Sequence, residues 1–282
     1  MHICIKSCII VYVKAGIYYN KNYLTENKPY CEKIRKSLER HKVSCSYVNN
    51  FCDLDGLDIL FVLGGDGTIL NIASECAKRQ VKIIGINYGH LGFLAEFERE
   101  KVDDAINLIC SGKYETEKRS LLEVNCNGTS YLALNDLVVQ RNTGGNSFNN
   151  TVRLQARING SVVDNFAADG IIVSTPTGST AYSLSAGGSV LTPDINAFIM
   201  TPVCAHSLHS RPVVYNDNSV LEIFKYDDDT PLNIVVDGKV VSVIGKNAVI
   251  TVKKSPICIE FITRSDSDFF NKLFIKLNIW SK

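Results

Sequence analysis

The stretch Ile59-Leu60-Phe61-Val62-Leu63-Gly64-Gly65-Asp66-Gly67-Thr68-Ile69-Leu70 decides how the chain folds. Its five leading apolar residues end at glycine, which is typical of a buried parallel strand. The residues that follow place apolar side chains on one helical stripe: Ile69, Ile72, Ala73, Cys76 and Ala77. The stretch therefore joins the carboxyl end of a strand to the start of a helix, which is where open α/β sheets bind ligands.

The loop inside this stretch combines glycines with a carboxylate. Gly64, Gly65 and Gly67 suit a backbone that approaches a phosphate closely, and the start of the helix supplies free N–H groups. Asp66 is unusual there, because a carboxylate repels phosphate. It fits a loop that also needs a base or a metal ligand beside the phosphate. The alternative is a tight turn in which Asp66 caps the helix.

Composition limits the class of protein. The 282 residues suggest about two domains. Because 30 basic and 29 acidic residues nearly cancel, no surface for nucleic acid or for a membrane is expected. No apolar run is long enough for a transmembrane helix. Ten scattered cysteines lack Cys-x-x-Cys and zinc-site spacing, which predicts reduced thiols and a cytoplasmic location.

The first part of the chain alternates strand and helix patterns. This predicts an α/β domain over residues 1–112, with a parallel sheet and helices on both faces. We expect strands at 3–13, 43–48, 58–63 and 81–86, and helices at 29–41, 68–78 and 102–110. Pro29 is expected to open the first helix.

From residue 113 short strands replace helices. This predicts an all-β, sandwich-like domain over 113–255 with one helical candidate at 180–189 and a mobile loop at 143–150. The tail, 256–282, has helical spacing over 269–280 and is expected to pack back onto the first domain. The strands expected are 121–126, 130–134, 137–141, 151–159, 162–166, 171–174, 211–215, 219–224, 232–236, 239–243 and 247–252.

Four further stretches could carry chemistry. The turn over 87–94 follows a strand of the same sheet, so it can line one crevice with the first loop, or be an ordinary turn. Asn135-Asp136 interrupts an apolar run and can bind ribose hydroxyls or an adenine edge, but from this fragment alone a hairpin turn is the better explanation. The run 168–188 is dense in small hydroxyl residues, which predicts a loop that wraps a dinucleotide. Residues 201–214 are interpreted as a structural turn with Arg211 as an internal anchor, because His206 and His209 lack a third metal ligand.

Together these stretches resemble the NAD kinase family. The resemblance rests on Gly64-Gly65-Asp66-Gly67-Thr68, on Asn87-x-Gly89-x-Leu91-Gly92-Phe93-Leu94, on Asn135-Asp136, on 169–188 and on His206-Ser-Leu…Arg211-Pro212, in the family's order and spacing. No Gly-x4-Gly-Lys-Ser/Thr loop and no Gly-x-Gly-x-x-Gly after a strand occurs, which disfavours P-loop kinases and Rossmann dehydrogenases. The chain differs from residues that members of the family carry at three matching positions, which are Ala167, Asn71 and Lys239.

The resemblance implies a transfer of the terminal phosphoryl group of ATP to the 2′-hydroxyl of the adenosine ribose of NAD, with Mg²⁺ held by ATP rather than by a protein site. Asp66 would be the base, and Asp169 would lie near the nicotinamide. The family also implies self-association, as a homodimer or homotetramer. The residues expected to bind the nucleotides are Gly64, Gly65, Asp66, Gly67, Thr68, Asn71, Asn135, Asp136, Asp169, Thr180, Ala181, Tyr182, Ser183, Leu184 and Ser185.

Two other functions remain open from the sequence. A lipid or sugar kinase could share the Gly-Gly-Asp-Gly loop, although 169–188 suits a dinucleotide better. A non-catalytic dinucleotide sensor could keep the binding loops, although Asp66 argues against it. In the leading hypothesis the second domain holds a ribose hydroxyl over Asp66.

Overall fold

The computed structural model describes residues 13–20, 24–87, 92–142, 151–207, 209–226, 230–265 and 267–280. The chain forms two compact units. Unit 1 contains Met1–Glu117 and Glu260–Lys282, and unit 2 contains Lys118–Ile259. The boundaries expected from the sequence, after residues 112 and 255, lie a few residues earlier.

Unit 1 is built on a parallel sheet. Its four principal strands lie in the order β2-β1-β3-β4, and each neighbouring pair is parallel. The short strand β5 continues the sheet beyond β4, and Phe261 of β17 also pairs with Ile83 of β4. The strands are β1 (Lys14–Tyr19), β2 (Ser44–Tyr47), β3 (Ile59–Leu63), β4 (Lys82–Asn87) and β5 (Phe97–Glu98).

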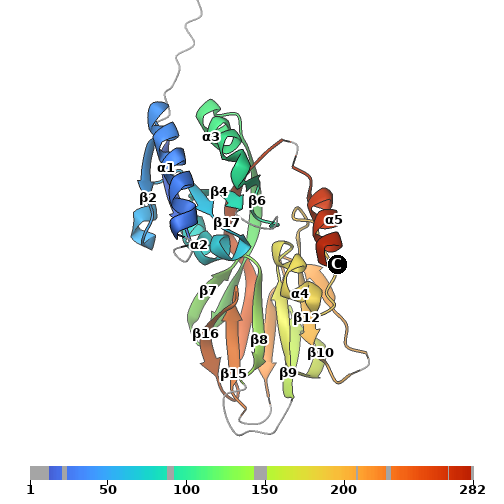
Figure 1. Cartoon of the computed structure of the whole chain (residues 1–282). Coiled ribbons are helices and arrows are strands. Elements are labelled where there is room, and N and C mark those ends of the chain that lie inside the picture. Colours follow the sequence, from blue (N-terminus) through green and yellow to red (C-terminus); the bar gives the residue numbers. More distant parts are fainter. Residues whose placement is uncertain are drawn as a thin grey trace, which may run out of the picture. The chain divides into compact units, whose positions relative to one another are not determined.

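Helices cover both faces of this sheet, as predicted. Helices α1 (Leu24–Arg40) and α3 (Val102–Ser111) lie side by side and share one core with alternate residues of β3 (Figure 1). Helix α2 (Asp66–Arg79) covers the opposite face, where a Cβ added at Gly85 would lie 2.9 Å from Ile69. The helix after β1 and the helix after β3 are therefore on opposite faces, so the direction of winding reverses between these two neighbouring strands. Two 3-10 turns complete the unit, η2 (Phe51–Leu54) and η3 (Arg99–Lys101).

Two predictions at the start of unit 1 need comment. Helix α1 begins at Leu24 and contains Pro29, so the prediction that Pro29 opens it is wrong. Pro29 is the sixth residue of α1, so its missing N–H leaves one backbone hydrogen bond of the second turn unmade. The strand expected at 3–13 lies outside the described residues except for Val13, and the first described strand, β1, was not predicted.

The tail forms helix α5 (Phe269–Trp280), at the bounds predicted, and returns to unit 1. Lys272 Nζ lies 2.5 Å from Glu96 Oε2 in a largely buried ion pair. The rings of Phe93 and Phe269 are 6.3 Å apart, and Lys276 Nζ lies 5.0 Å from the centre of the Phe93 ring. The tail thus packs against the turn that contains Phe93.

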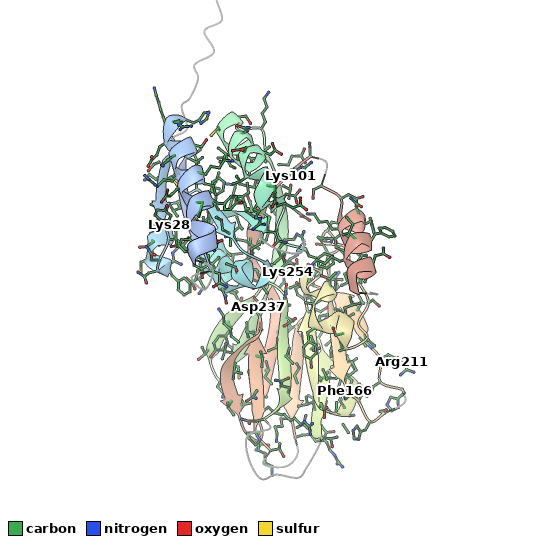
Figure 2. The ribbon with its side chains drawn as sticks, in the orientation of Figure 1. Lys28, Lys101, Phe166, Arg211, Asp237 and Lys254 are labelled. Carbon is green, nitrogen blue, oxygen red and sulfur yellow. The ribbon has the colours of Figure 1, made fainter. Side chains whose placement is uncertain are left out.

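Unit 2 is a sandwich of two antiparallel sheets, which confirms the predicted all-β class. One sheet has the order β10-β9-β14-β17, with β6 and β7 beside β17, and the other has the order β13-β12-β11-β8-β15-β16. Buried side chains of both sheets, such as Phe166 (Figure 2), Leu137 and Ile250, form one apolar core. The strands are β6 (Glu115–Cys126), β7 (Thr129–Ala133), β8 (Asp136–Arg141), β9 (Val152–Ile158), β10 (Ser161–Ala168), β11 (Gly170–Ser174), β12 (Ala197–Val203), β13 (Val213–Asn216), β14 (Leu221–Lys225), β15 (Leu232–Val236), β16 (Lys239–Ile244) and β17 (Val249–Thr263).

Sequence reasoning missed β12, which contains Pro202. Proline cannot donate a ladder hydrogen bond and argues against a central strand. Strand β13 pairs only with residues 197–200 of β12, so Pro202 lies beyond the end of that neighbour, where a missing N–H is tolerated. The predicted loop at 143–150 lies outside the described residues.

The helix expected over 180–189 is wrong in extent. A 3-10 turn, η4 (Thr177–Thr180), is followed by a single helical turn, α4 (Tyr182–Ser185). Ala181 has non-helical dihedral angles (φ −101°, ψ −127°) and Gly187 has φ +89°, so the backbone leaves the helix on both sides.

Two compositional expectations can be compared with the fold. In the part of the chain that the structure describes, no helix is long and apolar enough to cross a membrane. Within the same ranges all eight cysteines are free thiols, and several, such as Cys31 and Cys76, are buried.

Candidate functional site

One group of predicted site residues lies in unit 1, in the loop between β3 and α2. Gly65 is the N-cap of α2, and Asp66 is the first helical residue, so Asp66 does not cap the helix. Gly64 has φ +151°, and a Cβ there would collide with Thr68, so this position requires glycine. In contrast, a Cβ added at Gly65 or Gly67 would meet no atom within 4 Å. The fold therefore leaves open space in front of these two glycines.

Asp66 joins this loop to the turn after β4. Its Oδ2 accepts a hydrogen bond from the Phe93 N–H at 2.9 Å, and its Oδ1 accepts one from the Leu94 N–H at 3.1 Å. Gly92 packs so closely that a Cβ there would collide with the Asp66 carboxylate. The two loops therefore meet at Gly92, Phe93 and Leu94, whereas 88–91 lie outside the described residues, and the crevice that the loops are expected to line stays a prediction.

The Asp66 carboxylate is held but remains accessible. Asp66 is half-buried, and each carboxylate oxygen accepts one backbone hydrogen bond while it has room for a second. The two N–H groups fix the plane of the carboxylate, so a hydroxyl that approaches the free side would meet a fixed acceptor. Thr68, in contrast, is buried, and Asn71 is exposed on the outer side of α2.

Another group of predicted site residues lies in unit 2, where Asn135 precedes β8 and Asp136 is its first residue. Asp237 accepts three backbone hydrogen bonds from this segment: from Leu134 at 2.8 Å, from Asn135 at 2.8 Å and from Asp136 at 3.1 Å. Asp237 (labelled in Figure 2) has φ +46° and is followed by Gly238 with φ +77°, which is an Asp-Gly hairpin turn between β15 and β16. The loop Asn135-Asp136 is thus shaped by a residue 100 positions away.

Sequence reasoning missed Asp237. The only local signal was Asp-Gly between two alternating strands, which predicts a hairpin turn but not its long-range partners. The hydrogen bonds to residues 134–136 depend on the pairing of β8 with β15, where Val236 lies opposite Leu137. That pairing cannot be read from either segment alone.

Asp136 and Asp237 form a coupled acidic pair. Burial, and then the charge of Asp237, raise the pKa of Asp136 to about 7. Burial also raises the pKa of Asp237, but its three N–H donors and Lys239 act in the opposite direction. We therefore assign the charge near neutral pH to Asp237 and the proton to Asp136, whose O–H can then donate a hydrogen bond.

This pair predicts how stability depends on pH. Since the pKa of Asp136 is raised in the folded state, the folded protein binds a proton that the unfolded chain releases between about pH 4 and pH 7. The contribution of Asp136 to the free energy of unfolding is complete below this range and falls as pH rises through it, by up to about 1.4 kcal/mol per pH unit. Urea unfolding at several pH values should show a flatter profile for Asp136→Asn. Parallel profiles for the two proteins would contradict the raised pKa.

The hydroxyl-rich run after β11 is packed more internally than predicted. Thr175 Oγ1 donates to the Leu134 carbonyl at 2.5 Å, Ser179 Oγ donates to the Pro176 carbonyl at 2.6 Å, and Ser183 Oγ lies 2.9 Å from Thr201 Oγ1. Thr180 Oγ1 donates to the Thr177 carbonyl. The donor capacity of these hydroxyls is therefore used within the protein, and their contact with a dinucleotide stays a prediction. Small hydroxyl side chains are needed because the turn lies directly on residues 134–135, where a Cβ at Gly178 would collide with Asn135.

The remaining predicted residues of this loop are more accessible. Tyr182 is 43% exposed, Ser185 is exposed, and Ala181 and Leu184 are half-buried. The backbone of the loop is bonded to Asn135, whose carbonyl accepts the Thr175 N–H at 2.9 Å. The structure thus brings together Asn135, Asp136 and the start of 175–185.

Asp169 lies at the opposite end of the pair formed by β8 and β11, immediately before β11 begins. Ser174 pairs with Asp136 in β8, whereas Gly170 pairs with Gln140, so Asp169 is roughly 17 Å from that end, at about 3.4 Å per residue. Asp169 forms an ion pair with Arg141, at 3.4 Å. Arg211 lies in the loop before β13 (Figure 2), where it is exposed and donates to the Ser210 carbonyl, so its predicted role as an internal anchor is wrong. Among the described residues, no group of three His, Cys, Asp or Glu could hold a metal ion.

Comparison with known proteins gives consistent results for both parts of the chain. An ATP-NAD kinase N-terminal domain model matches residues 4–114, and an ATP-NAD kinase C-terminal domain model matches residues 134–264. The NAD kinase of Caldanaerobacter subterraneus subsp. tengcongensis is 40% identical over 266 residues, which are 91% of each protein. The NAD kinase of Clostridium botulinum (strain Kyoto / Type A2) is 42% identical over 259 residues, 88% of this chain and 89% of that protein.

Solved structures give the same picture. An NAD kinase from Archaeoglobus fulgidus in complex with ATP superposes with a TM-score of 0.77 at 26% identity and covers 94% of this chain and 99% of that one. The fold is also that of a yeast NADH kinase complexed with NADH, with a TM-score of 0.82 at 24% identity over 96% of this chain and 88% of that one.

Proposed function

Because this chain belongs to the NAD kinase family and is an enzyme that phosphorylates NAD, we propose that Asp66 is its general base. In this role Asp66 takes the proton of the 2′-hydroxyl of the adenosine ribose as the terminal phosphoryl group of ATP is transferred to that oxygen. One observation carries the proposal: both oxygens of this half-buried carboxylate, which lies at the start of α2, are oriented by the backbone N–H groups of Phe93 and Leu94.

Transfer of a phosphoryl group to a ribose hydroxyl requires a group that accepts the hydroxyl proton. A secondary hydroxyl is a weak nucleophile, and phosphoryl transfer depends mainly on alignment and on neutralisation of charge. The proton leaves late in the transfer, so a carboxylate with a fixed orientation is sufficient to accept it. The anchoring of Asp66 by Phe93 and Leu94 supports this role, because the base then needs little reorganisation at the moment of transfer.

The glycines before and after Asp66 would face the phosphates of ATP. Support comes from the space in front of Gly65 and Gly67, where no atom of the described residues lies within 4 Å of an added Cβ. The N–H groups of the first helical turn lack partners inside the helix, and the helix dipole favours an anion there. Gly64 serves a different purpose, since its positive φ is required to start the loop.

Gly67→Ala tests whether Gly67 serves the phosphate site or the stability of the fold. Gly67 is a helical residue with space for a methyl group, so alanine should stabilise the protein by about 0.5–1 kcal/mol. We expect the same change to raise the KM for ATP several-fold, because the methyl group occupies the space in front of the phosphates. Thermal unfolding and steady-state kinetics measure the two effects. An unchanged KM for ATP would remove Gly67 from the phosphate site.

The residues of unit 2 are proposed to bind NAD. Asn135 offers a half-buried amide, and protonated Asp136 offers a donor, which together suit ribose hydroxyls or an adenine edge. Ala181, Tyr182, Leu184 and Ser185 provide accessible surface beside them, whereas Thr180 and Ser183 contribute by shaping the loop. The position of Asp169 at the far end of β11 suits the nicotinamide end of an extended dinucleotide.

Mg²⁺ is proposed to enter with ATP. Because the described residues contain no cluster of three metal-ligating side chains, oxygen ligands from the phosphates and water would hold the ion. Bound in this way, Mg²⁺ neutralises charge on the transferred group. An excess of EDTA should abolish NADP formation and added Mg²⁺ should restore it. Full activity in EDTA would contradict the requirement.

Location and assembly are also proposals. Free cysteines throughout the described ranges support a reducing cytoplasm. Exposed valines on the sheet-edge strands β13 and β16, namely Val214, Val240 and Val243, support a homodimer or homotetramer. Light scattering coupled to gel filtration measures the assembly.

One assay tests the function as a whole. The protein is incubated with ATP, Mg²⁺ and NAD, and the product is coupled to an NADP-specific dehydrogenase. NADP formation is expected. Nucleotide binding without a product would indicate a sensor, and phosphorylation of a lipid or a sugar instead of NAD would indicate another kinase.

A further inference from the structure

The segment Phe93–Glu96 connects Asp66 to the tail of the chain. Its first two residues, Phe93 and Leu94, donate the N–H groups that hold the Asp66 carboxylate. Both donors lie in a bend that is neither helix nor strand, so their positions are not fixed by a regular pattern of backbone hydrogen bonds. The contacts that hold this bend therefore decide how the carboxylate is oriented.

On one side the segment packs on strand β4. The Glu96 N–H donates to the Gly85 carbonyl at 3.1 Å. A Cβ added at Gly85 would lie 2.8 Å from the Ala95 Cα, so the two backbones approach as closely as a glycine allows. The sheet thus fixes the second half of the segment, whereas Phe93 lies beyond this contact.

On the other side helix α5 contacts Phe93. The ring of Phe93 is 6.3 Å from the ring of Phe269, a distance at which two aromatic rings attract each other. Lys276 Nζ lies 5.0 Å from the centre of the same ring, within the range of a cation–π contact. One helix therefore supplies two partners to the side chain of the first donor.

The Glu96 side chain is the stronger attachment between the segment and the tail. It is only 6% exposed. Its carboxylate accepts hydrogen bonds from Lys272 Nζ at 2.5 Å, from Ser267 Oγ at 3.0 Å and from the Arg264 N–H at 3.4 Å. All three donors belong to the tail. Because a buried carboxylate is costly to leave unpaired, loss of Lys272 should loosen both Glu96 and α5.

Apolar packing contributes little to the attachment of α5 in the described part of unit 1. Phe270 and Phe274, its largest apolar side chains beside Phe269, remain exposed. A cavity of about 230 Å³ lies between α5 and the residues around Lys101. The position of α5 next to the segment therefore depends on the contacts that Phe93 and Glu96 make.

We propose that Glu96 and Lys272 are positioning residues for phosphoryl transfer. Their ion pair holds α5 against the segment, and the segment in turn holds the two N–H groups that orient Asp66. The inference rests on the proposed role of Asp66 as general base, and it adds two residues that act through this base and not on the substrates. A displacement of about 1 Å at a reacting group can lower a rate by about a hundredfold.

Lys272→Met tests the ion pair by its separate effects on kcat and KM. The kcat for NADP formation should fall about tenfold or more, while the KM values for ATP and NAD stay within about twofold, because the base loses its orientation and the substrates keep their contacts. Lys272→Arg keeps the cation and should retain most of kcat. An unchanged kcat in Lys272→Met, or equal losses in the two variants, would overturn the assignment.

Lys101→Met is the matched control. Lys101 (labelled in Figure 2) lines the same cavity, but it pairs with the exposed Glu98 at 4.0 Å and not with Glu96. This variant should leave kcat for NADP formation within about twofold. Losses of equal size in Lys101→Met and Lys272→Met would indicate a general effect of positive charge and would overturn the assignment.

Hydrogen exchange gives a readout that does not depend on turnover. In Lys272→Met, amide exchange of the peptide that contains residues 92–97 should be about tenfold faster, with the exchange of α2 unchanged. Mass spectrometry of the intact variant after labelling and digestion measures both. Unchanged exchange in 92–97 would show that the ion pair does not hold the segment, and would overturn the inference.

The combination with Asp66→Asn separates this inference from the proposed function. If Lys272 acts through Asp66, Lys272→Met should not lower the remaining kcat of Asp66→Asn any further. A second loss of full size in the double variant would overturn the inference and leave the role of the base intact. Turnover of Asp66→Asn at the unchanged rate would contradict the proposed function, whatever the effect of Lys272→Met.

Discussion

Replacement of Asp66 by asparagine is expected to lower kcat for NADP formation by about 10²–10⁴, the usual contribution of a general base. Asparagine has nearly the same shape but cannot accept the proton of the ribose hydroxyl. It keeps one acceptor oxygen for the N–H groups of Phe93 and Leu94, so the free energy of unfolding should fall by only about 1–2 kcal/mol. Single-turnover kinetics measure the effect on transfer, and thermal unfolding measures the effect on the fold.

The control for this variant is Asp103→Asn. Asp103 lies in the first turn of α3, as Asp66 lies in the first turn of α2, and it is exposed. The Asp103→Asn variant should leave kcat for NADP formation unchanged. Titration with NAD and with ATP completes the test, because Asp66→Asn should bind both nucleotides within a few-fold of the unchanged protein. Turnover at the unchanged rate in Asp66→Asn would show that another group, or water, accepts the proton.

Replacement of Asp237 by alanine is expected to destabilise unit 2 by at least about 3 kcal/mol and to weaken NAD binding at least about tenfold. The change leaves the backbone N–H groups of Leu134, Asn135 and Asp136 without their acceptor, at about 1–3 kcal/mol for each group that stays buried. Alanine at φ +46° adds about 1–2 kcal/mol of backbone strain. Urea unfolding and calorimetric titration with NAD measure the two effects.

Two further variants separate the causes. Asn247→Ala introduces alanine at a similar backbone position, φ +61°, in an exposed turn, and reports the strain alone. Asp237→Asn tolerates the positive φ and keeps one acceptor oxygen, so its effects should be smaller than those of alanine. It should also lower the pKa of Asp136 toward the usual range, because the neighbouring charge is gone. Equal NAD affinity in all three variants would mean that Asp237 does not shape the binding loop.

Local patterns predicted most of unit 1. The run Ile59–Leu63 and the stripe of α2 were strong signals because one face of a helix and all of a buried strand are apolar. The predictions were wrong at Pro29, where the position of proline in the helix depends on residues before it, and at β12, where Pro202 hid a strand. At Pro202 the extent of the neighbouring strand β13 decides whether the missing N–H is tolerated.

The sequence predicted which kinds of residue form the site better than it predicted how those residues are held in place. A glycine-aspartate loop after a strand indicated a base beside phosphates, but the N–H donors that hold Asp66 belong to residues 27 and 28 positions later. Asp237 acts over a hundred positions. The hydroxyl-rich loop was predicted to face a ligand, yet Thr175, Ser179 and Ser183 bond to the protein itself. Composition alone does not show whether a hydroxyl points inward or outward.

The inward hydroxyls of this loop have a consequence for the choice of inhibitors. A compound designed from the sequence would carry polar groups to meet serines and threonines, but the hydroxyls of Thr175, Ser179, Thr180 and Ser183 already bond within the protein. The accessible surface that remains is made of Ala181, the Tyr182 ring, Leu184 and Ser185. A flat, weakly polar scaffold that stacks on this surface, with a single polar arm for Asn135, is the better starting point for medicinal chemistry.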